Sequence, residues 1–123
     1  MIIALKDLTL LRSCDATIVN LSPYLGPSMD SGSAVELGFM AGLGRPVWGY
    51  TNEAKLFGNR VADLVPAGWE VERFGLVDNL MIEGTIDQCG GQVFRPDDTL
   101  EFDDFSVFER CVAALADSLK TST

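Results

Sequence analysis

The sequence predicts an α/β fold built around a parallel sheet. The main observation is a strand–helix–strand order within residues 16–50, because a crossover between parallel strands needs a connection of a dozen or more residues, usually a helix. A second is composition: 47% of the 123 residues are hydrophobic and 22% are charged, as in an ordinary globular protein. We therefore expect residues 1–123 to form a single α/β domain.

The N-terminal half supplies the elements of this crossover. Residues 2–13 carry apolar side chains at helical spacings and predict a helix. The β-branched run ATIVNL at residues 16–21 predicts a short buried strand that continues into a loop rich in proline and glycine. A second helix is expected from Ser33 to a C-terminal stop at Gly44, followed by a second strand at residues 45–50, RPVWGY.

The C-terminal half is less regular. We expect a short helix around residues 54–65, another helix over residues 78–88 and a short third strand at residues 92–94. Residues 103–120 predict the last helix, because apolar residues recur there at helical spacing. Two aspartates open this segment, where negative charge suits the helix dipole.

The charge of the chain argues against several classes of partner. Nine basic residues against eighteen acidic ones give a net charge of −9, and no run of Lys or Arg interrupts this balance. We therefore expect no nucleic-acid partner and no anionic membrane surface, since both are bound through clustered positive charge. Lys6 and Asp7 interrupt the first apolar stretch, so it resembles neither a signal peptide nor a membrane span. The expected location is the cytoplasm.

Cysteine and histidine usage limits the chemistry further. Cys14, Cys89 and Cys111 are far apart, form no CxxC pair and are accompanied by no histidine, so we expect reduced thiols and no metal site. The absence of histidine also excludes Ser-His-Asp and Cys-His catalysis. Carboxylates are the most plentiful reactive groups that remain, and no cofactor is expected.

The most informative stretch is DSGSAVELG, residues 30–38. One interpretation is structural: Ser33 and Glu36 fit an S-x-x-E capping box at the start of a helix. The alternative is catalytic, because a carboxylate in the first turn of a helix is favoured in its charged form and is available as a nucleophile. In that interpretation Gly32 leaves room for a ligand close to the backbone, and Gly38 lets the helix pack closely on a strand.

Three further residues have both a structural and a functional interpretation. Asp7 lies on or beside the apolar face of its helix, so it is either an acid at the solvated border of that face or a proton donor held among apolar side chains. Asn79 suits the N-cap of a helix. Tyr24 could stack on a planar ring or simply pack at the rim of the core.

The segment CDATIVNLSPYLGPSMDSGSAVELGFMAGLGRPV, residues 14–47, resembles the central part of the nucleoside 2-deoxyribosyltransferase family. That family's pattern runs from a strand through D-x-G-[TS]-x-x-E-[LV]-G to G-[KR]-P-V. Asp7 lies at the upstream spacing where the family has an active-site acid, and FGLVDNLM at residues 74–81 is similar to the family's asparagine-containing helix start. From about residue 83 onward only a generic C-terminal helix remains.

The resemblance implies a function and a role for each matched residue. The family transfers 2-deoxyribose between nucleobases in nucleoside salvage, with Glu36 as the nucleophile that forms a covalent glycosyl intermediate. Asp7 would help transfer a proton to or from the base, and Asp30 would hold the sugar 5′-hydroxyl. Asn79 would reach into a neighbouring subunit's site, which implies a homo-oligomer with shared active sites, and Tyr24 is a weaker candidate for base stacking. Deoxynucleosides and nucleobases would be the partners.

The resemblance also implies a three-layer, Rossmann/flavodoxin-like sheet flanked by helices. Family members begin with a strand, a glycine-containing loop, a helix and a second strand ahead of the segment that matches residues 2–15. This sequence does not contain that N-terminal βαβ part. Three explanations stay open: the start of the protein lies further upstream than residue 1, another chain completes the sheet, or this is a reduced variant with altered activity.

Two alternatives to base exchange stay open. One is hydrolysis of 2-deoxynucleoside 5′-monophosphates, against which Asp30 argues because a carboxylate facing the 5′ end would repel a phosphate. The other is a non-catalytic nucleoside-binding paralogue.

Overall fold

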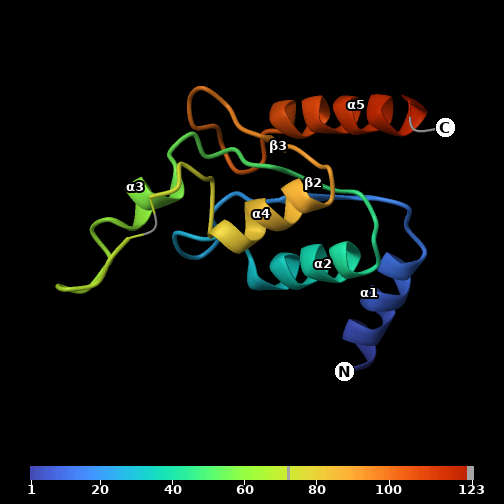
Figure 1. Cartoon of the computed structure of the whole chain (residues 1–123), viewed down its shortest axis with the longest axis horizontal. Helices are drawn as coiled ribbons and strands as arrows, with labels where there is room; N and C mark the ends of the chain where they lie inside the picture. Colours follow the sequence, from blue (N-terminus) through green and yellow to red (C-terminus); the bar gives the residue numbers. More distant parts are fainter. Residues whose placement is uncertain (72, 122–123) are drawn as a thin grey trace.

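Three parallel strands form an open sheet with helices on both of its faces (Figure 1). The computed structural model describes residues 1–71 and 73–121. Within them the strands are β1 (Thr17–Asn20), β2 (Val47–Tyr50) and β3 (Val93–Phe94). The helices are α1 (Ile2–Arg12), α2 (Ser31–Gly42), α3 (Phe57–Val61), α4 (Leu80–Gln88) and α5 (Ser106–Thr121).

The strands follow one another across the sheet in the order β1-β2-β3. Thr17 pairs with Val47, and Gly49 pairs with Val93. Because the strands are parallel, their carboxyl ends meet at one edge of the sheet, and this edge is where ligands bind in open α/β sheets. The loop between β1 and α2 starts at this edge.

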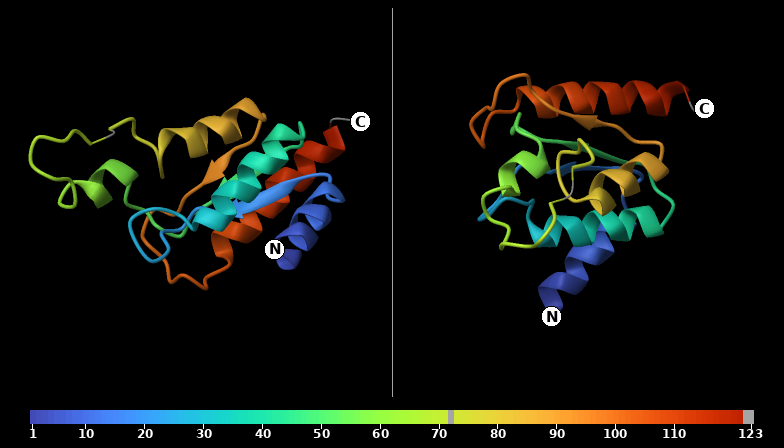
Figure 2. Two further views of the ribbon diagram at one scale, coloured as in Figure 1. Left: turned by 90° about the horizontal axis from the view of Figure 1, so that it is seen from below. Right: turned by 60° about the vertical axis from the view of Figure 1, so that its left-hand side comes forward.

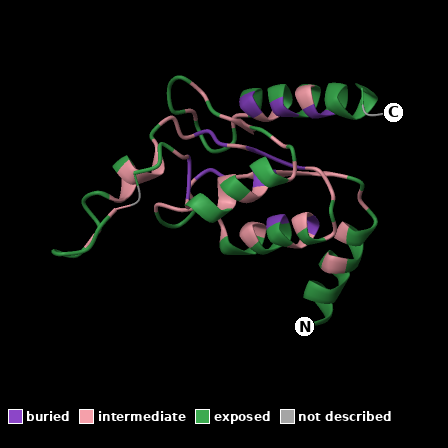
Figure 3. Cartoon of the chain, viewed as in Figure 1, coloured by how far each residue is buried: buried purple, intermediate pink, exposed green. Residues whose placement is uncertain are grey.

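One face of the sheet packs against α2 and α4. Val19 and Val47 point from the strands toward Leu37 and Met40 of α2 and Ile86 of α4, and all of them are buried. Helix α5 covers the opposite face, where Cys111 and Leu115 pack against Trp48. Figure 2 shows this arrangement from two further directions, and Figure 3 shows that the buried residues of α2 and α5 face the sheet between them. The expected three-layer α/β fold is confirmed.

Two glycines allow close approach in the core. A Cβ atom at Gly91 would lie 1.9 Å from the carbonyl oxygen of Val47, so only glycine fits between α4 and β3. A Cβ atom at Gly49 would lie 2.9 Å from a methyl group of Leu21. The expectation that Gly38 packs closely on a strand was wrong, since Gly38 is exposed and its Cβ position has no atom within 4 Å.

Most predicted elements are present with shifted ends. Helix α3 is shorter than the predicted 54–65 because Ala54 is held in the preceding loop, where its N–H donates to Thr99 Oγ1 and its carbonyl oxygen accepts from Arg95. Helix α5 begins at Ser106, since Asp104 accepts hydrogen bonds from Ser106 N and Oγ and therefore precedes the helix. Gly44 follows α2 with a φ of +72°, as its predicted role as a stop requires.

Helix α1 lies at one end of the molecule and contains no buried residue (Figure 1). Leu8 and Leu11 form its half-buried side, whereas Ile3 and Leu10, which share its predicted apolar face, are 76% and 65% exposed. The guanidinium of Arg12 lies 5.1 Å from the ring centroid of Phe39 in α2. Among residues 1–71 and 73–121, no helix is long and apolar enough to cross a membrane.

Candidate active site

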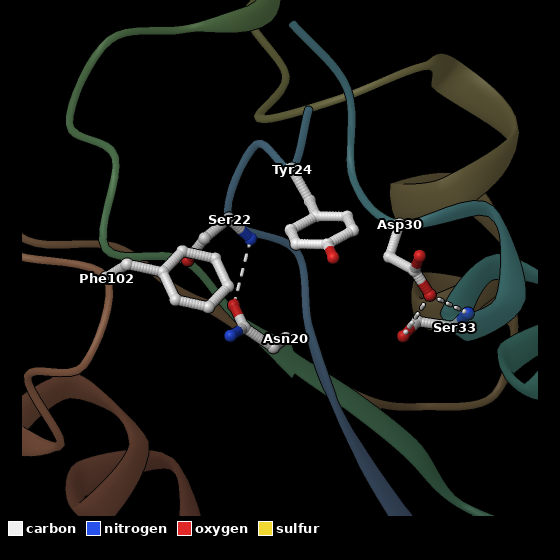
Figure 4. Close-up of a pocket in the computed structure, with 6 residues that line it drawn as sticks. All are labelled: Asn20, Ser22, Tyr24, Asp30, Ser33 and Phe102. Carbon is white, nitrogen blue, oxygen red and sulfur yellow. Dashed lines mark hydrogen bonds between the residues drawn. The ribbon is translucent and has the colours of Figure 1, made fainter. Parts of the chain in front are cut away.

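A pocket of about 310 Å³ lies at the carboxyl end of β1 (Figure 4). Three segments line it: the end of β1 with the loop that follows, the start of α2, and the loop before α5. The lining residues are Asn20, Ser22, Tyr24, Asp30, Ser33 and Phe102. Of these six, Asp30 carries the charge, so the pocket favours neutral or cationic ligand groups over anionic ones.

Two hydrogen bonds shape the loop that carries Tyr24, one to a side chain and one within the backbone. Asn20 Oδ1 accepts from Ser22 N at 2.9 Å, which turns the chain away from β1. Tyr24 N donates to Ser28 O at 2.9 Å and closes a tight turn. Within this turn Leu25 has a φ of +54°, a conformation that costs free energy for a residue other than glycine and must be held by its surroundings.

Asp30 is the N-cap of α2 and also lines the pocket. Its Oδ2 atom accepts from Ser33 N at 2.9 Å and from Ser33 Oγ at 3.1 Å. Ser33 is therefore the third residue of the helix, and the predicted Ser33–Glu36 capping box was wrong. Glu36 is the sixth residue of α2, so it lies in the second turn and not in the first as predicted.

Two aromatic rings line the pocket beside the polar groups. The ring centroids of Tyr24 and Phe102 are 6.2 Å apart with an interplanar angle of 39°, and the two residues are 48% and 55% exposed. Exposed ring faces beside a cluster of polar groups are typical of ligand sites. Phe102 is a residue that the sequence analysis missed, because it lies far along the chain from the other lining residues and belongs to no motif.

Buried Asn52 fixes the loop that carries Phe102. Its Nδ2 atom donates to the carbonyl oxygens of Glu101 at 2.8 Å, Phe102 at 3.3 Å and Asp104 at 2.9 Å. Its backbone N–H donates to Ser22 Oγ at 2.9 Å. Asn52 thus joins two segments of the pocket wall.

The remaining predicted site residues lie outside the lining of this pocket. Glu36 is exposed on α2, and Asp7 is exposed on α1. Gly32 is exposed beside Asp30, where an added Cβ would lie 3.1 Å from Asp30 Oδ2. Asn79 caps α4, its Oδ1 accepting from Met81 N at 2.9 Å, as the structural interpretation of that residue predicts. The structure therefore brings Asp30 and Tyr24 together in one pocket.

Over residues 1–71 and 73–121, no three His, Cys, Asp or Glu side chains form a group that could hold a metal ion. The cysteines Cys14, Cys89 and Cys111 are all free thiols.

Comparisons with known proteins give one family. The family model for nucleoside 2-deoxyribosyltransferase matches residues 1–81. An uncharacterized protein of Schizosaccharomyces pombe is 30% identical over an alignment that covers 94% of this chain and 62% of that protein. A solved structure, a 2-desoxiribosyltransferase from Leishmania mexicana, matches with a TM-score of 0.68 and 30% identity, over 94% of this chain and 66% of that one. The chain thus spans just under two thirds of the length of each relative.

Proposed function

Because this chain belongs to the nucleoside 2-deoxyribosyltransferase family, we propose that it transfers 2-deoxyribose from one nucleobase to another in nucleoside salvage. The observation that carries the proposal is the family match over residues 1–81, which includes Asp7, Asp30, Glu36 and Asn79. The structural likeness to a 2-desoxiribosyltransferase supports an enzyme of the same general kind.

Glu36 is the proposed nucleophile. Its carboxylate attacks C1′ of the deoxynucleoside, the bond between C1′ and the base nitrogen breaks, and its electron pair goes to the base. Asp7 supplies the proton that the departing base takes up. The second base then loses a proton to Asp7 and attacks C1′, which releases Glu36 and restores the β configuration after two inversions.

Asp30 is the proposed partner of the sugar 5′-hydroxyl. Both hydrogen bonds from Ser33 end on Oδ2, and within the described residues Oδ1 accepts no hydrogen bond, which supports its availability to a substrate hydroxyl. The same carboxylate opposes a 5′-phosphate through charge repulsion, so nucleosides are favoured over nucleoside monophosphates. Gly32 keeps the backbone beside this carboxylate accessible.

The proposal includes the oligomeric state of the protein. Asn79 contributes to the site of a neighbouring copy, so the active form is a homo-oligomer in which the sites are shared. The partners of the protein are deoxynucleosides and free nucleobases.

The test is an exchange reaction with purified protein. Deoxyinosine is incubated with and without free adenine, and deoxyadenosine and hypoxanthine are followed by chromatography beside a Glu36→Ala control. Deoxyadenosine that forms only when both adenine and Glu36 are present supports the proposal. Hypoxanthine without deoxyadenosine would indicate a hydrolase, and no product in any reaction would contradict catalysis of this kind.

A further inference from the structure

A fully buried carboxylate lies behind the loop between β1 and α2. Asp78 is 1% exposed and comes just before α4, 49 residues beyond Met29 in the sequence. Its Oδ2 atom accepts from Met29 N at 2.8 Å, and its Oδ1 atom accepts from Ser28 Oγ at 2.6 Å. A buried charge is costly unless several donors satisfy it. Because two of the donors to Asp78 belong to the loop, satisfying this charge favours the loop conformation that presents them.

Arg60 joins the same cluster from α3. Its Nε donates to Pro27 O at 3.0 Å and one Nη donates to Val77 O at 2.8 Å, while the same Nη lies 3.9 Å from Asp78 Oδ2. Burial lowers the pKa of Arg60, and the neighbouring Asp78 opposes that shift. Arg60 therefore holds Pro27, and Asp78 holds the next two residues of the same loop, Ser28 and Met29.

The contacts of Asp78 lead directly to proposed site residues. Asp78 binds Met29, which directly precedes Asp30. Asp78 also binds Ser28, whose carbonyl oxygen accepts the hydrogen bond from Tyr24 N that closes the turn. Asp78 Oδ1 additionally accepts from Asn79 N at 2.7 Å. The buried Asp78 carboxylate is thus linked through Met29 to Asp30 and through Ser28 to Tyr24. It also binds Asn79, the N-cap of α4, directly.

We propose that Asp78 is a positioning residue that holds the Asp30 carboxylate where it accepts the substrate 5′-hydroxyl. This inference rests on the proposed function. The physical basis is that a hydrogen bond to substrate depends on sub-ångström placement of its acceptor, and a loop without regular structure keeps that placement only through bonds to a rigid neighbour. Asp78 acts on the substrate through Asp30 and does not touch it.

The test compares two substrates that differ in one hydroxyl: 2′-deoxyadenosine and 2′,5′-dideoxyadenosine, which lacks the 5′-hydroxyl. Exchange with free hypoxanthine is measured for the wild type, Ser28→Ala, Asp78→Asn and the control Asp87→Asn, which removes an exposed carboxylate from α4, the helix that follows Asp78. Ser28→Ala removes a single hydrogen bond to Asp78 and serves as the milder variant. Thermal unfolding checks that each variant is folded.

We expect kcat/KM for 2′-deoxyadenosine to fall about threefold to tenfold in Ser28→Ala and at least tenfold in Asp78→Asn. For 2′,5′-dideoxyadenosine the same variants should change kcat/KM less than twofold, and Asp87→Asn should change neither value. In an Asp30→Asn background, Ser28→Ala should have no additional effect. Equal losses on both substrates would overturn the proposal, because a general structural defect does not depend on the 5′-hydroxyl.

Hydrogen exchange gives a readout that does not require activity. In folded Ser28→Ala and Asp78→Asn the amides of Tyr24 and Met29 should exchange faster than in the wild type, and unchanged exchange would overturn the positioning role. If the wild type transfers no deoxyribose, the proposed function fails. The hydrogen-exchange rates of the Tyr24 and Met29 amides still decide whether Asp78 positions the loop.

Discussion

Asp30 accepts both of its hydrogen bonds from Ser33 on one carboxylate oxygen, Oδ2, at 2.9 Å from the backbone nitrogen and 3.1 Å from Oγ. One side of the carboxylate is thereby committed to the start of α2, and the residue also lines the pocket. Because a single side chain both caps a helix and lines the pocket, its effects on stability and on the proposed specificity can be separated by a replacement that keeps only the cap.

Asp30→Ser should change specificity at little cost in stability. Serine is also a good N-cap, so the free energy of unfolding should stay within about 0.5 kcal/mol of the wild type. Loss of the charge should raise the ratio of kcat/KM for deoxyinosine 5′-monophosphate to that for deoxyinosine by at least tenfold. Hypoxanthine release from the two substrates measures this ratio.

The matched control for this change in net charge is Asp15→Ser. Asp15 is exposed and precedes β1, at the end of the strand away from the pocket. The control should leave the ratio unchanged. An equal rise in both variants would mean that the charge of the whole protein, and not Asp30, discriminates against the phosphate.

A slow substrate should trap the proposed nucleophile. A 2-fluoroarabinosyl nucleoside forms the glycosyl ester with Glu36 but releases it slowly, because the fluorine destabilises the positive charge of the transition state. Intact-mass measurement should show one added fluorosugar per chain, and fragment masses should place it on Glu36. Glu36→Gln should abolish the adduct, whereas Glu109→Gln, on the exposed surface of α5, should retain it. An adduct on another residue would assign the nucleophile elsewhere.

Asn52→Ala should destabilise the fold and the Phe102 loop together. The substitution removes one buried amide that donates to three carbonyl oxygens, so we expect the free energy of unfolding to fall by about 2–3 kcal/mol. Urea denaturation measures this loss. Asn59→Ala, at an exposed position of α3, should cost less than about 0.5 kcal/mol, and a similar cost at both positions would show that the Asn52 contacts contribute little.

Cys111 should make stability fall at high pH. Burial raises the pKa of its thiol from 9.0 to about 11, so the unfolded chain loses this proton at a lower pH than the folded one. The contribution is therefore complete below about pH 9 and is lost as pH rises toward 11. Unfolding measured at pH 8 and pH 10.5 should show a smaller decrease for Cys111→Ala than for the wild type.

Some decrease in stability at high pH should remain in Cys111→Ala, because Tyr50 is still present. The pKa of Tyr50 is raised mainly by burial and to a smaller extent by the neighbouring Cys111, and this shift lowers stability at high pH in the same direction. Identical pH dependence in the two proteins would show that Cys111 makes no contribution.

The order of strands and helices could be predicted because it depends on local periodicity. The strand at ATIVNL, the following helix and the strand at RPVWGY are each recognisable from a few neighbouring residues. The start of α2 could not be predicted, since Ser33 and Asp30 are both good N-caps and lie three residues apart. Asp30 is the N-cap in the structure, and the residue before it, Met29, is bound by Asp78 from 49 residues away.

The pocket was predictable only where it coincides with a motif. Asp30 and Tyr24 lie within the segment that resembles a known family, whereas Phe102 comes from a loop far from that segment. Its place in the pocket depends on hydrogen bonds from Asn52, which lies 50 residues earlier in the sequence, and no local pattern encodes such contacts.

Mixing two inactive variants should restore activity if sites are shared between copies. Glu36→Ala lacks the proposed nucleophile, and Asn79→Ser lacks the proposed contribution to the neighbour's site while keeping a side chain that can cap α4. In a pair of neighbouring copies that contains one of each variant, one shared site then has both intact residues and the other has neither. Random exchange between equal amounts of the two variants should therefore restore about a quarter of wild-type transfer activity. Subunit exchange is verified with chains of different mass, and no recovery after complete exchange would mean that Glu36 and Asn79 act within one chain or that Asn79 serves only as the cap of α4.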